Sequence, residues 1–221
     1  MVPFPALALR GGLTLFGTVG AFDMTSLNDV LNVLNAEYEV DRQPVRFDPI
    51  DSGVSYGVGL HSPLGERLLV GLEWERLAAS TDVGGPLDKN RIDAEADVYG
   101  ASFMIDFVPR SKFRFGFEGA LGYLSSRSAQ TIFANDVQIL KTDLDGSSAT
   151  YRLSLAFGVP ATASLDFSVG LGWRWAKVTD LGGQLTTNIR ESLTAPPVFH
   201  PLDSLDWSGV YGRAAVTLFV F

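Results

Sequence analysis

Only one of the two histidines in the chain has neighbours suited to nucleophilic catalysis. His200 is followed by Asp203, Ser204 and Asp206, which are the side-chain types of a serine, histidine and acid arrangement. Prolines on both sides of His200 indicate a rigid loop, however, and closeness in sequence does not supply the geometry that catalysis needs. His61 lies in a turn-like sequence, where capping a turn is a commoner role than catalysis. We therefore expect no catalytic residues in this chain.

Two pairs of carboxylates are the next candidates for chemistry. Glu73 and Glu75 have the spacing of two side chains on one face of a strand, where they could serve as an acid and a base. Two carboxylates on one face inside a protein pair with arginine more often than they act as an acid and a base. Asp143 and Asp145 followed by Gly146 resemble the start of a calcium loop, but the remaining ligand spacing is missing. We therefore expect no metal and no cofactor.

The charge and length of the chain narrow the class of protein. A net charge of −8 argues against a nucleic-acid partner, which would require a basic face. The chain also lacks a glycine-rich phosphate loop and the spacing of a zinc site. Its 221 residues suffice for one sizeable unit, and we expect a single domain over residues 1–221.

Hydrophobic and polar residues alternate along eight stretches, and a period of two is the signature of a β-strand. In the clearest stretch, Phe113, Phe115 and Phe117 alternate with Arg114 and Glu118. Each stretch has about the 9 to 11 residues that a tilted strand needs to cross a bilayer. The stretches lie at residues 7–15, 54–61, 68–75, 99–107, 113–123, 151–159, 165–174 and 210–221. The sequence therefore predicts an all-β fold of eight antiparallel strands.

Large aromatic residues gather at the ends of these stretches. If successive strands are antiparallel, tyrosine and tryptophan lie at one height and phenylalanine at the opposite height. Two aromatic girdles on either side of an apolar band are typical of a transmembrane up-and-down β-barrel. The expected first girdle is Tyr56, Trp74, Tyr99, Tyr123, Tyr151, Trp173, Trp175, Trp207 and Tyr211, and the second is Phe107, Phe113, Phe115, Phe219 and Phe221.

The other face of each stretch carries glycine, alanine, serine and a few charged residues. A soluble barrel of the lipocalin type would turn this face to water, for which so many small residues are poorly suited. Inside a narrow barrel, small residues leave room for long charged side chains, which must be paired there. The expected interior charge network is Arg10, Glu73, Glu75, Asp106, Arg114, Glu118, Arg152, Asp166 and Arg174.

The sequence does not decide which residues of the last stretch point into the barrel. Tyr211, Phe219 and Phe221 share their register with Arg213 and Thr217, and a lipid-facing arginine at mid-membrane costs ~2–4 kcal/mol. Either Arg213 points inward, or a bulge shifts the register between Tyr211 and Phe219.

Connections between the stretches alternate between short and long. Tight turns are expected at 61–66, 108–112 and 160–164, and long segments at 17–53, 77–96, 125–149 and 177–206. Long loops outside the cell and short turns in the periplasm are the asymmetry of outer-membrane barrels. We therefore expect both termini in the periplasm, with a signal peptide already removed.

One long segment contains an expected short helix that starts near Thr25 or Ser26. Its apolar residues recur at helical spacing, and a second apolar run follows at 132–140. The helix is either a lid that packs its leucines onto the barrel mouth, or a docking helix for a partner or the outer leaflet. The candidate docking residues are Leu27, Val30, Leu31, Leu34 and Ile139.

With these strands, girdles, loops and terminal aromatics, the chain resembles the small eight-stranded outer-membrane barrels of Gram-negative bacteria, such as the OmpA transmembrane domain and the OmpX and OmpW groups. The resemblance is architectural and covers nearly the whole chain. It implies that Phe219 and Phe221 form the C-terminal signal read by the barrel-assembly machinery. The implied partners are outer-membrane lipid, lipopolysaccharide, that machinery and another envelope protein.

The function implied by this resemblance is that of a non-enzymatic barrel with a plugged interior. It would act as a structural or partner-docking component of the cell envelope through its long extracellular loops. A narrow channel for small or apolar solutes is the alternative, and a lipid-modifying outer-membrane enzyme comes third.

Overall fold

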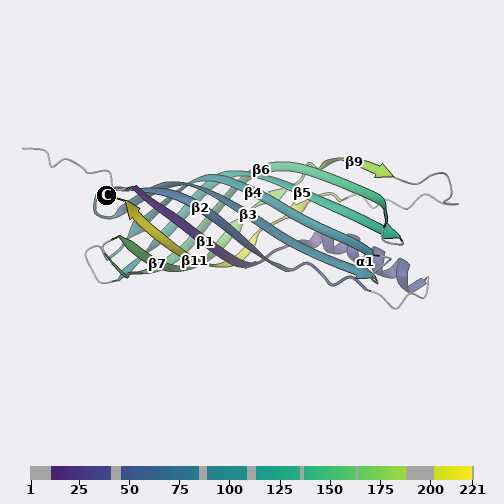
Figure 1. Ribbon diagram of the computed structural model, residues 1–221, viewed down its shortest axis with the longest axis horizontal. Coiled ribbons are helices and arrows are strands. Elements are labelled where there is room, and N and C mark those ends of the chain that lie inside the picture. Colours follow the sequence, from purple (N-terminus) through teal and green to yellow (C-terminus); the bar gives the residue numbers. More distant parts are fainter. Residues whose placement is uncertain are drawn as a thin grey trace, which may run out of the picture.

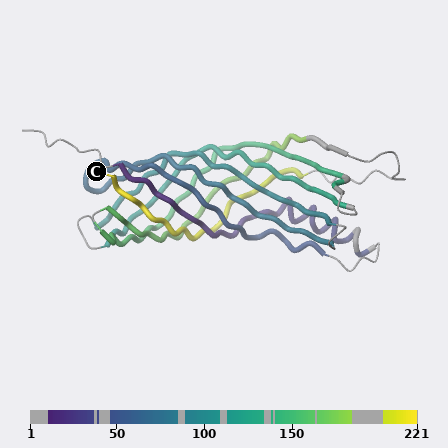
Figure 2. Tube along the Cα trace, in the orientation of Figure 1, coloured from purple at the N-terminus to yellow at the C-terminus, as the bar shows by residue number. Residues whose placement is uncertain are grey.

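Eight strands form a closed antiparallel ring, in which the first and last strands pair with each other. The computed structural model describes residues 11–40, 46–84, 89–108, 113–134, 137–162, 164–187 and 202–220. The strands of the ring are β1 (Gly11–Ala21), β2 (Ser52–Leu64), β3 (Leu68–Gly84), β4 (Lys89–Asp106), β5 (Arg114–Ala134), β6 (Val137–Pro160), β7 (Leu165–Trp175) and β11 (Gly209–Val220). Figure 2 shows the purple first strand beside the yellow last strand, where the ring closes. The predicted eight-stranded antiparallel barrel is confirmed.

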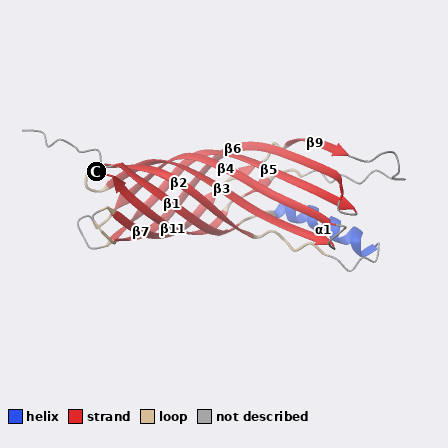
Figure 3. Ribbon diagram, in the orientation of Figure 1, coloured by secondary structure: helices blue, strands red, loops and turns tan. Residues whose placement is uncertain are grey.

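The two ends of the barrel differ in what connects the strands (Figures 1 and 3). At one end β1 begins, β11 ends and a turn at 65–67 joins β2 to β3, and we call this the turn end. Gly65 has a φ of 84°, a left-handed conformation that glycine adopts without strain. The opposite end, the helix end, carries helix α1 (Thr25–Val40) and the short strands β8 (Lys177–Val178), β9 (Gly182–Thr187) and β10 (Leu205–Asp206). No helix of the described residues is long and apolar enough to cross a bilayer.

Four strands run far past the length that the sequence predicted. β3, β4, β5 and β6 have 17, 18, 21 and 24 residues and reach toward the helix end beyond the others (Figure 1). The β3–β4 register continues without a shift from Leu68 opposite Ile105 to Gly84 opposite Lys89. The segments 77–96 and 125–149 therefore consist mostly of paired strand, and their prediction as long loops is wrong.

The sequence does not reveal the extra length, because the apolar side chains change from the outer face to the inner face along each strand. Near the turn end, β4 exposes Phe103 outward and buries Asp106 inward. Near the helix end, the same strand exposes Arg91 outward and buries Ile92 inward. A strand that leaves hydrocarbon for water must invert its pattern, because its outer face then meets water and its inner face meets a packed core.

The helix end encloses a hydrophobic core of its own. We use the name helix-end extension for α1, β8–β10 and the strand segments 77–84, 89–96, 125–134 and 137–149. Trp207 is fully buried there, with its ring 5.1 Å from that of Phe22 and its Nε1 donating a hydrogen bond to Ser126 Oγ. Trp207 therefore does not lie in the outer girdle where it was expected. The buried core consists of Phe22, Met24, Leu27, Leu31, Leu34, Phe47, Ile50, Leu77, Val83, Ile92, Ala94, Ala96, Val98, Leu124, Ala176, Val178, Leu202, Leu205 and Trp207.

Helix α1 is the lid of this core, which corrects the docking hypothesis. Leu27, Leu31 and Leu34 are only 2%, 1% and 8% exposed, and Val30 packs against the same core. Ile139 lies on β6, but its side chain is outside the described part of the chain. The docking hypothesis requires residues 77–96 and 125–149 to be loops, whereas their strands supply the apolar surface that covers the leucines.

Two asparagines on α1 fix the segment that returns from the helix to β2. Asn28 accepts a hydrogen bond from Ile50 N at 2.8 Å and donates one to Ile50 O at 3.0 Å. Asn35 makes the same pair with Phe47, at 2.7 and 3.1 Å. A side-chain amide matches a backbone amide in this way, so the two asparagines hold the segment on the helix.

Candidate functional site

An apolar belt with an aromatic rim surrounds the outside of the barrel. Leu72 and Leu171 in this belt are 67% and 64% exposed. So much exposed hydrophobic surface is typical of a wall in contact with hydrocarbon. Toward the helix end the belt finishes in aromatic rings, of which Tyr151 and Trp175 stack with their centroids 4.8 Å apart. The expected girdle residues on this outer surface are Tyr56, Trp74, Tyr99, Tyr123, Tyr151, Trp173 and Trp175.

Tyr211 does not belong to this girdle, although the sequence placed it there. It is 2% exposed, and the guanidinium carbon of Arg174 lies 5.3 Å from the centre of its ring. Because β11 pairs with β1 and β7 in an unbroken register, its odd-numbered residues point inward. The prediction rested on the height of Tyr211 along the strand, which does not tell whether the side chain points inward or outward. The same register turns Arg213 inward without a bulge, which settles the alternative left open by the sequence.

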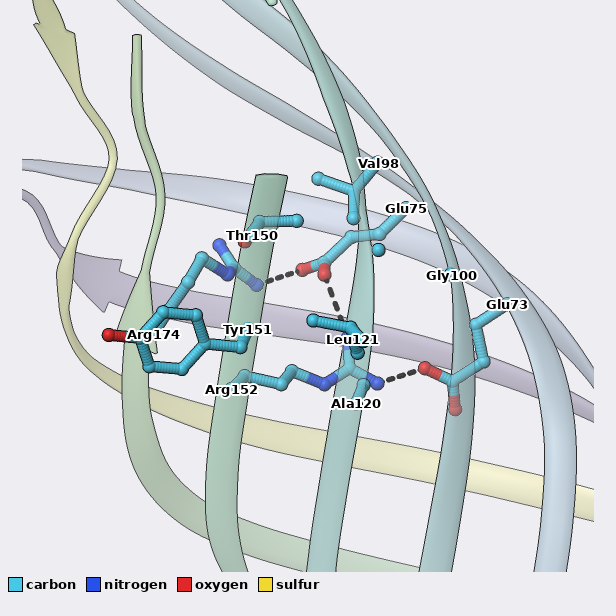
Figure 4. A pocket seen from close by; sticks show the side chains of 11 residues that line it. Glu73, Glu75, Val98, Gly100, Ala120, Leu121, Thr150, Tyr151, Arg152 and Arg174 are labelled. Carbon is cyan, nitrogen blue, oxygen red and sulfur yellow. Dashed lines mark hydrogen bonds and ion pairs between the residues drawn. The ribbon is translucent and has the colours of Figure 1, made fainter. Parts of the chain in front are cut away.

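Six charged side chains meet at the centre of the ring and form what we call the central network. Arg152 pairs with Glu73, and its Nη1 lies 3.0 Å from Glu75 Oε2. Arg174 reaches the other oxygen of Glu75, with Nη2 2.6 Å from Oε1. Figure 4 shows Glu75 between the two arginines, and Glu73 on the far side of Arg152. The network consists of Glu73, Glu75, Glu118, Arg152, Arg174 and Arg213.

Arg213 completes this network, although its facing could not be decided from the sequence. Its Nη2 lies 3.0 Å from Glu73 Oε1, and its Nη1 donates to Glu118. Its guanidinium carbon also lies 3.9 Å from the centre of the Phe16 ring, a cation–π contact. Three glutamates thus face three arginines. Buried charges persist in a narrow interior when they are paired in this manner.

His61 is a second interior residue that the sequence analysis placed elsewhere. Strand β2 continues to Leu64, so His61 lies within the strand and not in the following turn. Its Nε2 is 3.1 Å from Glu73 Oε1 and 3.2 Å from Ser102 Oγ, and its Nδ1 is 2.9 Å from Thr14 Oγ1. A hydroxyl, an imidazole and a carboxylate are thus linked, but they face the closed interior of the barrel.

A smaller charge cluster lies between the central network and the turn end. Arg114 pairs with Asp166, and its Nε lies 3.7 Å from Asp106 Oδ2. A cavity of about 50 Å³ is lined by Arg114 and Asp166 of this cluster and by Glu118 and Arg213 of the central network. Its size suits one or a few water molecules. Among the described residues, no group of three or more histidine, aspartate or glutamate side chains could hold a metal ion.

Most of the expected interior residues lie in these two charge clusters. Arg10 and Phe221 lie outside the described residues. Phe219 faces inward with the other odd-numbered residues of β11, so its expected place in the outer phenylalanine girdle is wrong. The guanidinium carbon of Arg114 lies 5.9 Å from its ring centre. The expected residues found in the two charge clusters are Glu73, Glu75, Asp106, Arg114, Glu118, Arg152, Asp166 and Arg174.

Charged residues cover the outside of the helix-end extension. Asp143 lies 3.0 Å from Arg127 and 2.8 Å from Lys141, and Lys89 pairs with Asp82. The hydrogen bond from Lys89 lowers the pKa of the Asp82 carboxyl below its ordinary value. The hydrogen bond from Lys141 likewise lowers the pKa of Asp143. Exposed pairs of this kind add little stability, so their main effect is to make this surface polar.

Solved structures of bacterial outer-membrane proteins share this fold. The chain aligns with the outer membrane protein OprG from Pseudomonas aeruginosa at a TM-score of 0.51 and 13% identity, over 96% of this chain and 97% of that one. It aligns with a major outer membrane protein from Thermus thermophilus at a TM-score of 0.51 and 8% identity, over 95% and 99%. Neisserial surface protein A aligns at a TM-score of 0.45 and 11% identity, over 95% and 97%. No family model matches the sequence, and a search of curated proteins gave no match.

The two alignments at a TM-score of 0.51 agree with the features of the wall itself. The ring is closed, its outer surface is apolar between aromatic residues, and its interior is polar and ion-paired. That distribution is the inverse of a water-soluble barrel. The chain is therefore an eight-stranded transmembrane β-barrel with the fold of the small bacterial outer-membrane proteins.

Proposed function

We propose that this chain is a closed, non-enzymatic barrel that anchors the helix-end extension at the cell surface and conducts no solutes. The observation that carries the proposal is the filling of the interior at two successive levels. Within the apolar belt, the central network occupies the lumen, which in an eight-stranded barrel is only wide enough for side chains. Above it, Trp207, Leu31 and the rest of the core fill the helix-end extension.

We infer that the helix end faces the outside of the cell and the turn end faces the periplasm. The helix-end extension has a polar outer surface and a packed interior, which suit an aqueous environment. The turn end has short connections, and barrels of this class place short turns in the periplasm.

The plugged interior predicts that the protein does not act as a channel. Planar-bilayer recordings of the purified barrel should show no steady conductance, because an ion would have to break paired charges and then cross an apolar core. A porin reconstituted in the same way controls for detection. Large, stable, voltage-independent openings would contradict the proposal and favour the narrow channel.

The role of the helix-end extension is, on this proposal, to present a rigid polar surface to another envelope protein. The α1 leucines are buried, and we place the proposed contact on the outer face of the extended sheet. Arg91 and Arg127 are available there, with side chains 49% and 60% exposed. Their charges are oriented by Asp93 and Asp143, which fixes their geometry before any partner binds.

Reversing these two charges should separate binding from folding. We expect Arg91→Glu with Arg127→Glu to reduce co-purification of envelope proteins from native membranes several-fold, because like charges across an interface are repulsive. Lys177→Glu is the matched control, since Lys177 is 53% exposed at the same end but lies on β8. Unchanged co-purification in the double variant would assign any docking to a different surface.

An enzymatic role has less support. The linked Thr14, His61 and Glu73 face the lumen, and the adjoining cavity of about 50 Å³ is far smaller than a lipid substrate requires. His61 is the one histidine among the described residues, and the other candidate, His200, lies outside them.

A further inference from the structure

An apolar hollow of about 570 Å³ lies on the outside of the barrel wall, across β1, β11, β7 and β6. One row of directly paired residues runs through it from strand to strand. The row consists of Gly17, Ala214, Val169 and Phe157. The next row toward the turn end adds Leu15 and Phe167. Four strands spaced about 4.8 Å apart make the hollow roughly 14 Å long across the wall.

The hollow exists because two small residues stand in a row of large ones. Gly17 and Ala214 form its floor, and Leu15 and Val169, 60% and 58% exposed, rise beside them. A Cβ atom added to Gly17 would meet nothing closer than the carbonyl oxygen of Ser55 at 3.6 Å. The space above Gly17 is therefore open toward the surroundings of the barrel.

The hollow lies in the half of the belt nearer the turn end. On β7, Val169 and Phe167 are four and six residues from the girdle residue Trp173, counted toward the turn end. On β6, Phe157 is six residues from the girdle residue Tyr151 and three from the end of the strand at Pro160. With the orientation inferred under the proposed function, on which this step rests, the hollow faces the periplasmic leaflet, which consists of phospholipid.

We propose that the hollow is a binding site for one acyl chain of a phospholipid. It is continuous with the belt that already contacts hydrocarbon, and its lining side chains are apolar apart from Ser168. An unfilled hollow in a membrane-facing wall would forfeit dispersion contacts on every side. A flexible chain can follow the floor over Gly17 and Ala214 and restore those contacts, so it should exchange more slowly here than elsewhere on the wall.

A second copy of the barrel fits the hollow less well. In a twofold-symmetric contact the same patch faces itself. The floor of one hollow would then lie opposite the floor of the other, and a void would remain between two walls held rigid by their hydrogen-bonded strands. An acyl chain has no such constraint.

The site can be tested by filling it. Gly17→Phe with Ala214→Leu should fill the hollow, because a Cβ at Gly17 has room and Ala214 is exposed. Ala101→Phe is the matched control, because Ala101 is an exposed alanine of the belt on β4, on the opposite side of the ring. Heat-dependent migration on SDS gels checks that each variant retains the folded barrel.

The readout is photolabelling in phosphatidylglycerol vesicles whose acyl chains carry a diazirine in both leaflets. We expect several-fold more label at Val169 and Phe167 than at Phe103 and Ile105, which lie four and six residues from the girdle residue Tyr99 on the opposite wall. The double variant should lose this excess, and Ala101→Phe should keep it. Because both leaflets carry the probe, an error in the inferred orientation would not change the labelling, and protease accessibility of the helix end on whole cells tests that orientation separately.

Two results would overturn the proposal. Equal labelling of the two walls in the unmodified protein would show that lipid at the hollow exchanges as it does along the rest of the belt. Cross-links between barrels, together with protection of Val169 and Phe167 from the lipid probe, would show that a second copy occupies it.

Discussion

Replacing Arg152 by methionine should lower the free energy of unfolding of the barrel by about 3–5 kcal/mol, the typical cost of breaking a buried ion pair. Arg152 is 5% exposed and contacts Glu73, Glu75 and Glu118. Its removal leaves three glutamates facing two arginines in a lumen with little water. Urea titrations of the barrel in lipid vesicles, followed by tryptophan fluorescence, measure the loss.

A second change at the correct glutamate should recover much of this stability. Glu73→Gln is the best choice, because Arg174 keeps Glu75 and Arg213 keeps Glu118 when Glu73 is neutral. Arg127→Met is the control for removing an arginine, since its side chain is 60% exposed, and it should change stability by less than about 0.5 kcal/mol. If Arg152→Met unfolds at the same urea concentration as the unmodified protein, the network is hydrated and does not depend on pairing.

Much of the membrane-spanning part could be predicted from the sequence, and the reason is the strict period of strands. Successive side chains of a strand alternate between its two faces, so the facing of Glu73, Arg152 and Arg174 followed from the apolar residues on either side of them. Each strand has one apolar face and one polar face. In a membrane-spanning wall the apolar face meets lipid, so the charged side chains lie inside. Their individual partners depend on how the strands are staggered around the lumen, and the alternation alone does not give that stagger.

The facing of Arg213 cannot be decided from the sequence of its own strand. Odd and even positions of β11 both carry apolar residues, so the alternation does not distinguish inside from outside. The register with β1 decides it, since Thr18 opposite Arg213 and Thr14 opposite Thr217 are both buried. Tyr211 was assigned to the wrong face for the same reason.

The helix-end extension could not be recognised because its strands follow a different rule. Beyond Glu75 on β3 and Tyr99 on β4 the charged residues face outward, and small apolar residues such as Ala94 and Ala96 face inward. Alanines alternating with aspartates and glutamates resemble a solvated loop when they are judged by composition. These strands can be found by searching for stretches that keep a period of two but in which the polar and apolar faces have changed places.

Replacing Leu31 by aspartate should unfold the helix-end extension and leave the membrane-spanning barrel intact. Leu31 is 1% exposed and packs in the core that also buries Trp207. Even Leu31→Ala should cost about 2–5 kcal/mol through lost burial and the cavity left behind, and a buried unpaired carboxylate costs more. Hydrogen exchange measured by mass spectrometry should show fast exchange of β4 residues 89–97 and slow exchange of β1 and β11.

The same helix supplies the control, and the comparison decides between a lid and a docking surface. Val33 is 43% exposed on α1, so Val33→Asp places the same charge two residues away without entering the core. It should leave exchange in residues 89–97 unchanged. If Leu31→Asp also leaves exchange unchanged but abolishes co-purification of an envelope protein, then the leucines form an external docking surface and the lid is wrong. If only Leu31→Asp loosens the extension, the leucine stripe acts through folding, and any partner must recognise the polar surface that the folded strands present.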